Sequence, residues 1–161
     1  MAVIDSLEFA RTGQTLSGSL PLAGLTRLKD SLYDAAGEVR FSVKGGHDTR
    51  RRPVLKLEIS GTLCLQCQRC MGVLEYPLRV ANTLLLVAGE AGGFTDEDLE
   101  WIAASATQDV PTLVEDEILL SLPYAPRHEE AQCGGASEGA VSERDGTIAF
   151  ARLAALKRNS Q

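Results

Sequence analysis

The sequence predicts an α+β fold: a single domain whose antiparallel β-sheet, with a long hairpin at about residues 54–87, is packed by two or three helices. Two observations support this prediction. Apolar and polar residues alternate over long stretches of the first half of the chain, as in half-buried strands, and helical spacing of apolar residues appears in a few shorter segments. With 161 residues, of which 44% are hydrophobic, the chain is long enough to bury one core.

The N-terminal third is expected to hold strands and one helix. Residues 3–9 alternate loosely and residues 16–20 alternate clearly, so both segments are predicted to be strands. Between residues 25 and 33, apolar side chains recur at helical spacing, and Gly37 stands where such a helix would stop. Period two returns at residues 39–44, which predicts another strand.

The clearest strands form the predicted hairpin. The apolar phase of its first strand consists of Leu55, Leu57, Ile59, Leu63 and Leu65. The apolar phase of its second strand consists of Leu74, Tyr76, Leu78 and Val80. Only residues 67–72 lie between the two runs, and such a short connection joins antiparallel neighbours.

A helix is predicted to begin at Thr112, because Glu115 three residues later completes a capping-box pattern. The apolar residues that follow are Leu113, Val114, Ile118, Leu119 and Leu122. Pro123 and Pro126 would end this helix.

The predicted organisation has three parts. Residues 1–130 form the α+β domain, with a cysteine knuckle at residues 64–72. Residues 131–146 are poor in apolar side chains and rich in Gly, Ser and Glu, which predicts a flexible loop. Residues 147–161 are predicted to form a short C-terminal helix and tail.

Composition limits the classes of function. The formal net charge is −6, so general attraction to nucleic acid is not expected, and any RNA contact must be local or pass through a protein partner. The start of the chain has acidic residues and no long apolar stretch, so neither an export signal nor a membrane span is expected. The predicted location is the cytoplasm, where closely spaced cysteines favour metal or thiol chemistry over disulfides.

The strongest chemical signal is the segment Cys64-Leu-Gln-Cys67-Gln-Arg-Cys70. Cys67 and Cys70 bracket the predicted hairpin turn, where two sulfurs can point at one metal ion, as in zinc knuckles. A tetrahedral zinc needs two more ligands, and the candidates are His128 and Cys133, or Cys64 as a substitute. Zinc is therefore a possible cofactor, and ordinary buried cysteines are the alternative.

A redox role is a further alternative for Cys67 and Cys70. In thioredoxin-like sites the two cysteines open a helix, whose N-terminus lowers the pKa of the nucleophilic thiol. Here the motif lies between two predicted strands and no βαβ pattern surrounds it, so redox catalysis ranks below metal binding.

The acidic triplet Glu115, Asp116 and Glu117 lies in the predicted helix. Glu115 and Asp116 are expected on its solvated face, near the helix N-terminus. Glu117 falls within the apolar arc, which predicts a structural carboxylate paired with an arginine, a lysine or the backbone. No catalytic arrangement accompanies these carboxylates, so no catalytic residue is predicted.

The basic run of the chain is a loop between two predicted strands that contains Arg50, Arg51 and Arg52. Together with Arg69, Lys157 and Arg158, these residues are the candidates for contact with RNA or with a partner. The stacking aromatics of single-strand RNA readers are missing, since aromatic residues make up only 5% of the chain.

Three stretches of the chain together resemble the YceD family, the large ribosomal RNA subunit accumulation proteins. They are LQCQRCMGVLEYPL, LVEDEILLSLPYAPRHEEAQC and IAFARLAALKRN, and they span about the last two thirds of the chain. The resemblance implies a cytosolic, non-enzymatic accessory factor in the synthesis, processing or stability of large-subunit ribosomal RNA. It also implies a ribosomal protein or a large-subunit ribosomal precursor as partner. A zinc-knuckle interaction or regulatory protein unrelated to ribosomes is the second hypothesis, and a thiol oxidoreductase the third.

Overall fold

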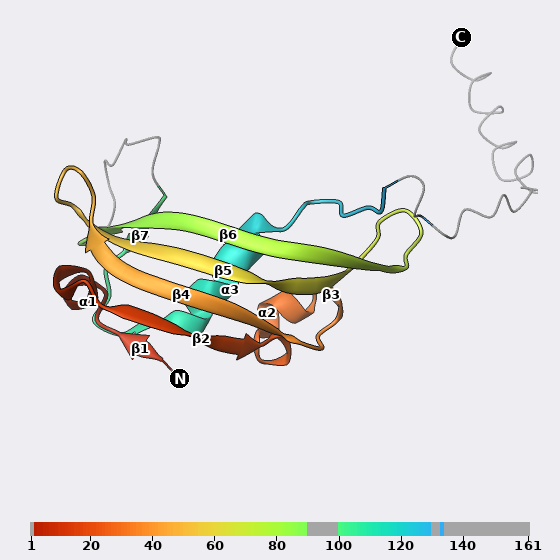
Figure 1. The fold of residues 1–161 in the computed structure, drawn as a ribbon, viewed down its shortest axis with the longest axis horizontal. Coiled ribbons are helices and arrows are strands. Elements are labelled where there is room, and N and C mark those ends of the chain that lie inside the picture. The colour runs from red at the N-terminus through yellow and green to blue at the C-terminus, as the bar shows by residue number, and fades with distance from the viewer. Residues whose placement is uncertain (1, 90–99, 130–132, 134–161) are drawn as a thin grey trace, which may run out of the picture.

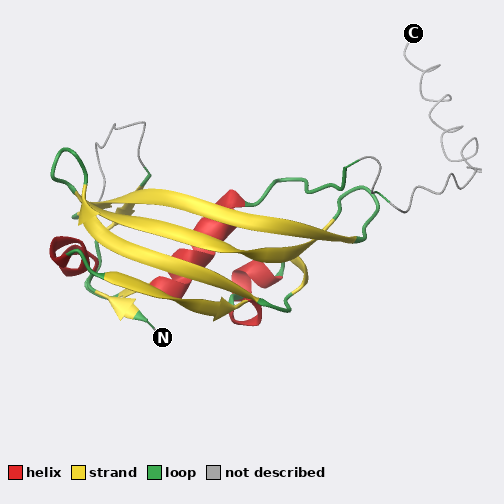
Figure 2. Ribbon diagram, viewed as in Figure 1, coloured by secondary structure: helices red, strands yellow, loops and turns green. Residues whose placement is uncertain are grey.

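The computed structural model describes residues 2–89, 100–129 and 133, and its framework is one curved sheet (Figures 1 and 2). The strands of the sheet lie in the order β2-β4-β5-β6-β7, and β3 pairs with the far end of β5. Their bounds are β2 Thr15–Pro21, β3 Leu32–Asp34, β4 Glu38–His47, β5 Pro53–Gln66, β6 Val73–Val87 and β7 Trp101–Ala103. The short strands β1 (Val3–Ile4) and β8 (Gln108–Asp109) form a separate antiparallel pair.

The predicted hairpin is confirmed as β5 and β6, which pair antiparallel from Val54↔Leu85 to Gln66↔Val73. Burial alternates along most of both strands as the sequence pattern indicates, with Leu57 and Ile59 buried and Lys56 and Glu58 exposed. At the end near the β4–β5 loop the alternation stops, because Val54 and Leu85 are buried as well. Because side chains alternate between the two faces of a strand, the sheet has one apolar face and one polar face.

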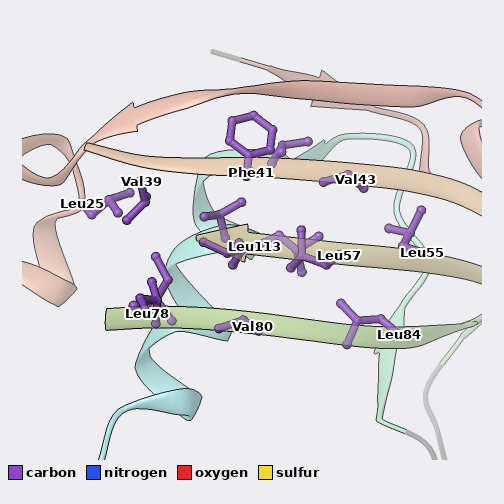
Figure 3. Close-up of a cluster of buried hydrophobic side chains, with 14 of the residues drawn as sticks. Leu25, Val39, Phe41, Val43, Leu55, Leu57, Leu78, Val80, Leu84 and Leu113 are labelled. Carbon is purple, nitrogen blue, oxygen red and sulfur yellow. The ribbon is translucent and has the colours of Figure 1, made fainter. Parts of the chain in front are cut away.

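Helix α3 (Val110–Ser121) crosses the apolar face of the sheet (Figure 1). Its buried residues Leu113, Val114 and Ile118 join one hydrophobic cluster with the inward side chains of the strands. Figure 3 shows part of this cluster, in which Leu113 of α3 lies among side chains of the strands such as Leu57 and Val80. The α+β fold class is therefore confirmed. The other helices of the described residues are α1 (Ser6–Thr12), α2 (Thr26–Lys29) and the short 3-10 helix η1 (Leu22–Gly24).

Helix α1 packs directly against β4 at Gly45. A Cβ atom built on Gly45 would lie 2.1 Å from the backbone oxygen of Phe9. The close approach is fixed by the hydrogen bond from the Gly45 amide to the Gln14 carbonyl, 2.8 Å long. The neighbouring Gly46 has nothing within 4 Å of such a Cβ atom.

We expect Gly45→Ala to lower the free energy of unfolding by about 1–3 kcal/mol, because the added methyl group must push α1 away from the sheet. Gly46→Ala is the matched control and should change stability by less than about 1 kcal/mol. Urea denaturation of the two variants measures the difference. Equal stabilities would show that α1 is not held against Gly45.

Three sequence predictions of secondary structure are wrong in part. Residues 3–9 are not one strand, because Asp5 caps α1 by accepting a hydrogen bond from the Glu8 amide. The helical spacing at residues 25–33 yields only the four residues of α2 before β3 begins. Helix α3 begins at Val110 rather than Thr112, since Asp109 is its N-cap and accepts a hydrogen bond from the Thr112 amide.

One further detail of the sheet differs from the prediction. Strand β7 runs parallel to β6, with Leu85↔Trp101 and Val87↔Ala103 paired, so the sheet is mixed rather than wholly antiparallel.

The predicted flexible loop at 131–146 lies, apart from Cys133, outside the described residues, and so do the predicted helix and tail at 147–161. In the part of the chain that the structure describes, no helix combines the length and apolar content needed to cross a membrane.

Candidate metal centre

The turn between β5 and β6 presents the two cysteines of the knuckle. The Cys67 amide donates to the Gly72 carbonyl at 2.9 Å, and the Met71 amide donates back to the Cys67 carbonyl at 2.9 Å. Met71 adopts the left-handed conformation, with φ at 60°, which closes this tight turn. Cys67 is buried and Cys70 half-buried as a result.

A second segment reaches the turn from the end of α3. The Gln68 amide donates a 2.8 Å hydrogen bond to the Pro126 carbonyl, which ties the turn to the proline-rich stretch after the helix. The next residues of that stretch carry His128 and, further on, Cys133. Arg69 holds both, since its side chain donates to the Cys133 sulfur and to the His128 carbonyl, each at 3.4 Å.

Four potential ligands meet where the two segments touch. One ligand atom each from Cys67, Cys70, His128 and Cys133 lies within 4.8 Å of all the others. The Cys67 and Cys133 sulfurs are 3.9 Å apart, and the Cys70 sulfur is 3.4 Å from Nδ1 of His128. A tetrahedral zinc with ordinary bond lengths places two sulfurs about 3.8 Å apart, and a sulfur and a nitrogen about 3.5 Å apart. Both of these distances are therefore close to those in a zinc coordination shell.

The orientation of His128 also suits a ligand. Its Nε2 lies 2.7 Å from the Val73 carbonyl oxygen, which can only accept a hydrogen bond, so Nε2 carries the proton. In neutral imidazole this leaves Nδ1 unprotonated and directed at the sulfurs. A backbone carbonyl that holds the second ring nitrogen is the usual support of a histidine bound to a metal.

The electrostatics of the cluster favour the thiolates of Cys67 and Cys133 but oppose that of Cys70. A hydrogen bond from the Cys70 amide, with others from His128 and Arg69, lowers the pKa of the Cys67 thiol to about 5 against the cost of desolvation. The Arg69 guanidinium lowers the pKa of the Cys133 thiol. The Gly72 amide favours the Cys70 thiolate, but the Cys133 and Cys67 sulfurs outweigh it and raise the pKa of Cys70. Hydrogen bonds to Cys133 and to the Val73 carbonyl raise the pKa of His128.

The structure thus brings together Cys67, Cys70, His128 and Cys133, which are the residues that the sequence offers as a zinc site. Cys64 stands in β5 opposite Glu75 and is not one of the four. The motif lies in a strand–turn–strand segment instead of opening a helix, so it lacks the helix N-terminus on which thioredoxin-like redox sites depend.

Two of the three acidic residues in α3 differ from the sequence prediction: Glu115 in its burial and Glu117 in its hydrogen-bond partner. Glu115 is buried rather than solvated, and it accepts hydrogen bonds from the Arg27 and Leu28 amides and from the Arg27 guanidinium. Glu117 is buried as predicted, but its partner is Asn82, whose side-chain amide donates to it. Desolvation is the main cause that raises the pKa of Glu117.

The predicted contact residues lie far apart in the structure. Arg50, Arg51 and Arg52 form the β4–β5 loop, in which Asp48 accepts hydrogen bonds from the amides and the side chain of its neighbours. Arg69 lies at the opposite end of the sheet, in the knuckle. Lys157 and Arg158 lie outside the described residues.

The fold and the cluster together define a class: a small α+β protein whose hairpin turn and post-helix segment share three cysteines and a histidine. The chain belongs to the YceD family, whose model, described as "Large ribosomal RNA subunit accumulation protein YceD", matches residues 55–157. It is also 32% identical over 124 residues to "Uncharacterized protein YlbN" of Bacillus subtilis (strain 168), a match that covers 72% of each chain. No solved structure matches the chain significantly.

Proposed function

We propose that this protein is a non-enzymatic accessory factor in the synthesis, processing or stability of large-subunit ribosomal RNA. The observation that supports the proposal is membership of a family described by large ribosomal RNA subunit accumulation, with a match that spans residues 55–157. Its partner is a ribosomal protein or a precursor of the large subunit, met in the cytoplasm.

The proposed role of the knuckle is to hold a structural zinc ion. Cys67, Cys70, His128 and Cys133 supply four ligand atoms within 4.8 Å of one another, and the Val73 carbonyl fixes the histidine. Four protein ligands leave no open position for a substrate or a water molecule, so the ion would stabilise the structure rather than carry out chemistry. Zinc there would fasten the hairpin turn to the segment that follows α3.

Depletion of the protein from its host tests the ribosomal role. The ratio of mature large-subunit RNA to small-subunit RNA is expected to fall, and expression of the wild-type chain should restore it. Electrophoresis or sequencing of the RNA measures this ratio of large-subunit to small-subunit RNA. An unchanged ratio after complete depletion would contradict the proposal.

A further inference from the structure

The polar face of the sheet concentrates positive charge on an acidic protein. Arg40, Lys44, Lys56 and Arg79 are all exposed and all lie on the strand phase that points away from α3. Figure 1 looks onto this side of the sheet, with α3 behind the strands. We call these four residues, on neighbouring strands β4, β5 and β6, the basic face.

The strand register sets the four cations in two rows. Arg40 pairs with Ser60, which pairs in turn with Arg79, so the two arginines flank one serine across the sheet. Lys44 lies directly opposite Lys56. Strands are spaced about 4.8 Å apart and rise about 3.3 Å per residue, so the rows span roughly 10 Å across the sheet and 13 Å along it.

No ion pair among the described residues involves the four cations of the basic face, whereas Arg11, Arg27 and Arg52 each pair with a carboxylate. Glu58 is the one acidic side chain on the strand positions between the two rows. Like charges placed directly opposite each other destabilise a sheet, so this arrangement has a cost that folding alone does not explain.

The surrounding side chains indicate which partner fits. Beside the rows, most outward positions carry small or hydroxyl side chains, including Ser17, Ser19, Ser42, Ser60 and Thr83. Beyond the lysine row, Val54 and Leu85 share the outward phase but are buried, and Trp101 of the edge strand β7 pairs with Leu85. A protein partner is usually held by aromatic and large apolar anchors, and single-stranded RNA by aromatic stacking platforms, whereas the positions within and between the two rows carry neither. Arginine, lysine and hydroxyl groups are the donors that contact phosphates and sugars. Double-helical RNA is recognised in this way, through its phosphates and 2′-hydroxyl groups.

We propose that the basic face binds the sugar–phosphate backbone of double-helical RNA without reading its sequence. This proposal rests on the proposed function and deepens it, because it makes RNA itself a direct partner. The β4–β5 loop, with exposed Arg51, extends from the Lys44 and Lys56 end of the face. The acidic residues Glu38 and Glu75 lie toward the opposite, knuckle end, which confines the RNA to the loop half of the sheet.

The test measures binding of a fluorescently labelled RNA duplex of about 20 base pairs to the full chain between about 50 and 200 mM salt. Two double variants, Arg40→Gln with Arg79→Gln and Lys44→Gln with Lys56→Gln, each remove two cations and should leave the fold intact. Each is expected to weaken binding at least tenfold and to reduce the slope of log K against log salt by about 1.8, because each phosphate contact contributes roughly 0.9 in a nucleic-acid duplex. Arg11→Gln with Lys29→Gln is the matched control, since it removes two exposed cations carried by α1 and α2.

Three results would overturn the proposal: wild-type protein that does not bind the duplex, face variants that bind as wild type does, or an equal loss in the control variant. Tighter binding to polyglutamate than to the duplex would also overturn it, in favour of an acidic protein partner. The ribosomal role is judged separately by the RNA ratio after depletion. A fall in that ratio together with no duplex binding would remove the basic-face proposal and leave the proposed function standing.

Discussion

Cys67→Ala is expected to abolish zinc binding. Protein purified without chelator should contain one zinc per chain, and the variant should contain about a tenth of that or less, because Cys67 is a buried ligand at the centre of the cluster. Inductively coupled plasma mass spectrometry measures the metal, and Cys64→Ala is the matched control. That variant removes a cysteine from the same segment but keeps all four proposed ligands, so it should retain zinc.

Loss of the metal should also appear as loss of stability. A ligand that binds only the folded state stabilises it, so a strong chelator should lower the melting temperature of the wild-type protein and leave that of Cys67→Ala unchanged. Wild-type protein without stoichiometric metal, or Cys67→Ala that retains zinc, would contradict the proposed site. The four side chains would then be three thiols and an imidazole, held together by Arg69 and by backbone amides.

Glu115→Ala is expected to lower the free energy of unfolding by about 2–4 kcal/mol, because it leaves two backbone amides without a partner near the core. Helix α2 has no side-chain cap of its own, and the Glu115 carboxylate performs that role from α3 by accepting from Arg27 and Leu28 at 2.7 and 3.0 Å. Asp116→Ala is the control, since Asp116 pairs with the same arginine but is half exposed, and its loss should cost less than about 1 kcal/mol. Urea denaturation at neutral pH compares the two variants, and equal losses would contradict the capping role.

The effect of Glu115 should depend on pH. Desolvation opposes ionisation of this carboxyl, but hydrogen bonds from Leu28 and Arg27 outweigh it and lower its pKa below the ordinary value of 4.5. A lowered pKa in the folded state means that the stabilisation is complete above 4.5 and is lost as the pH falls through the folded pKa. The stability difference between wild type and Glu115→Ala should therefore shrink in acid, and a difference that does not change with pH would rule out the ionised carboxylate as its source.

The sequence pattern predicts the structure correctly where residues close together in the chain determine it. Strict alternation predicted β5 and β6 together with their short turn, and the phase of the cysteines placed Cys67 and Cys70 in that turn. His128 and Cys133 could be proposed as ligands only by residue type, because nothing local indicates that residues 58 positions apart meet. The hydrogen bond from Gln68 to Pro126, which brings them together, leaves no trace in the periodicity of either segment.

The wrong predictions have two physical causes. At α1 the loose alternation of residues 3–9 predicts a strand, but the cap formed by Asp5 and Glu8 and the stop at Gly13, which has φ at 64°, produce a helix instead. At Glu115 the helical wheel placed the side chain correctly relative to its own helix, but burial there depends on α2, a contact between residues 88 positions apart. A helical wheel describes one helix and cannot show what packs against it.

The net charge of the chain also does not show where on the surface RNA could bind. The value of −6 describes the whole chain, and it predicts only that any RNA contact is local or passes through a protein partner. Only the strand register shows that Arg40 and Arg79 flank one serine and that Lys44 faces Lys56. An acidic protein can therefore present a locally basic surface, and the position of charges matters more for binding than their sum.

The junction between the β5–β6 turn and the segment after α3 also constrains the unfolded chain. Cys70 and His128 are 58 residues apart, and β6, β7 and α3 all lie between them. A cross-link that closes a loop of that length removes conformational entropy from the unfolded ensemble worth about 4 kcal/mol in the loop-closure model. The proposed metal would thus stabilise the domain as a cross-link that a chelator can remove.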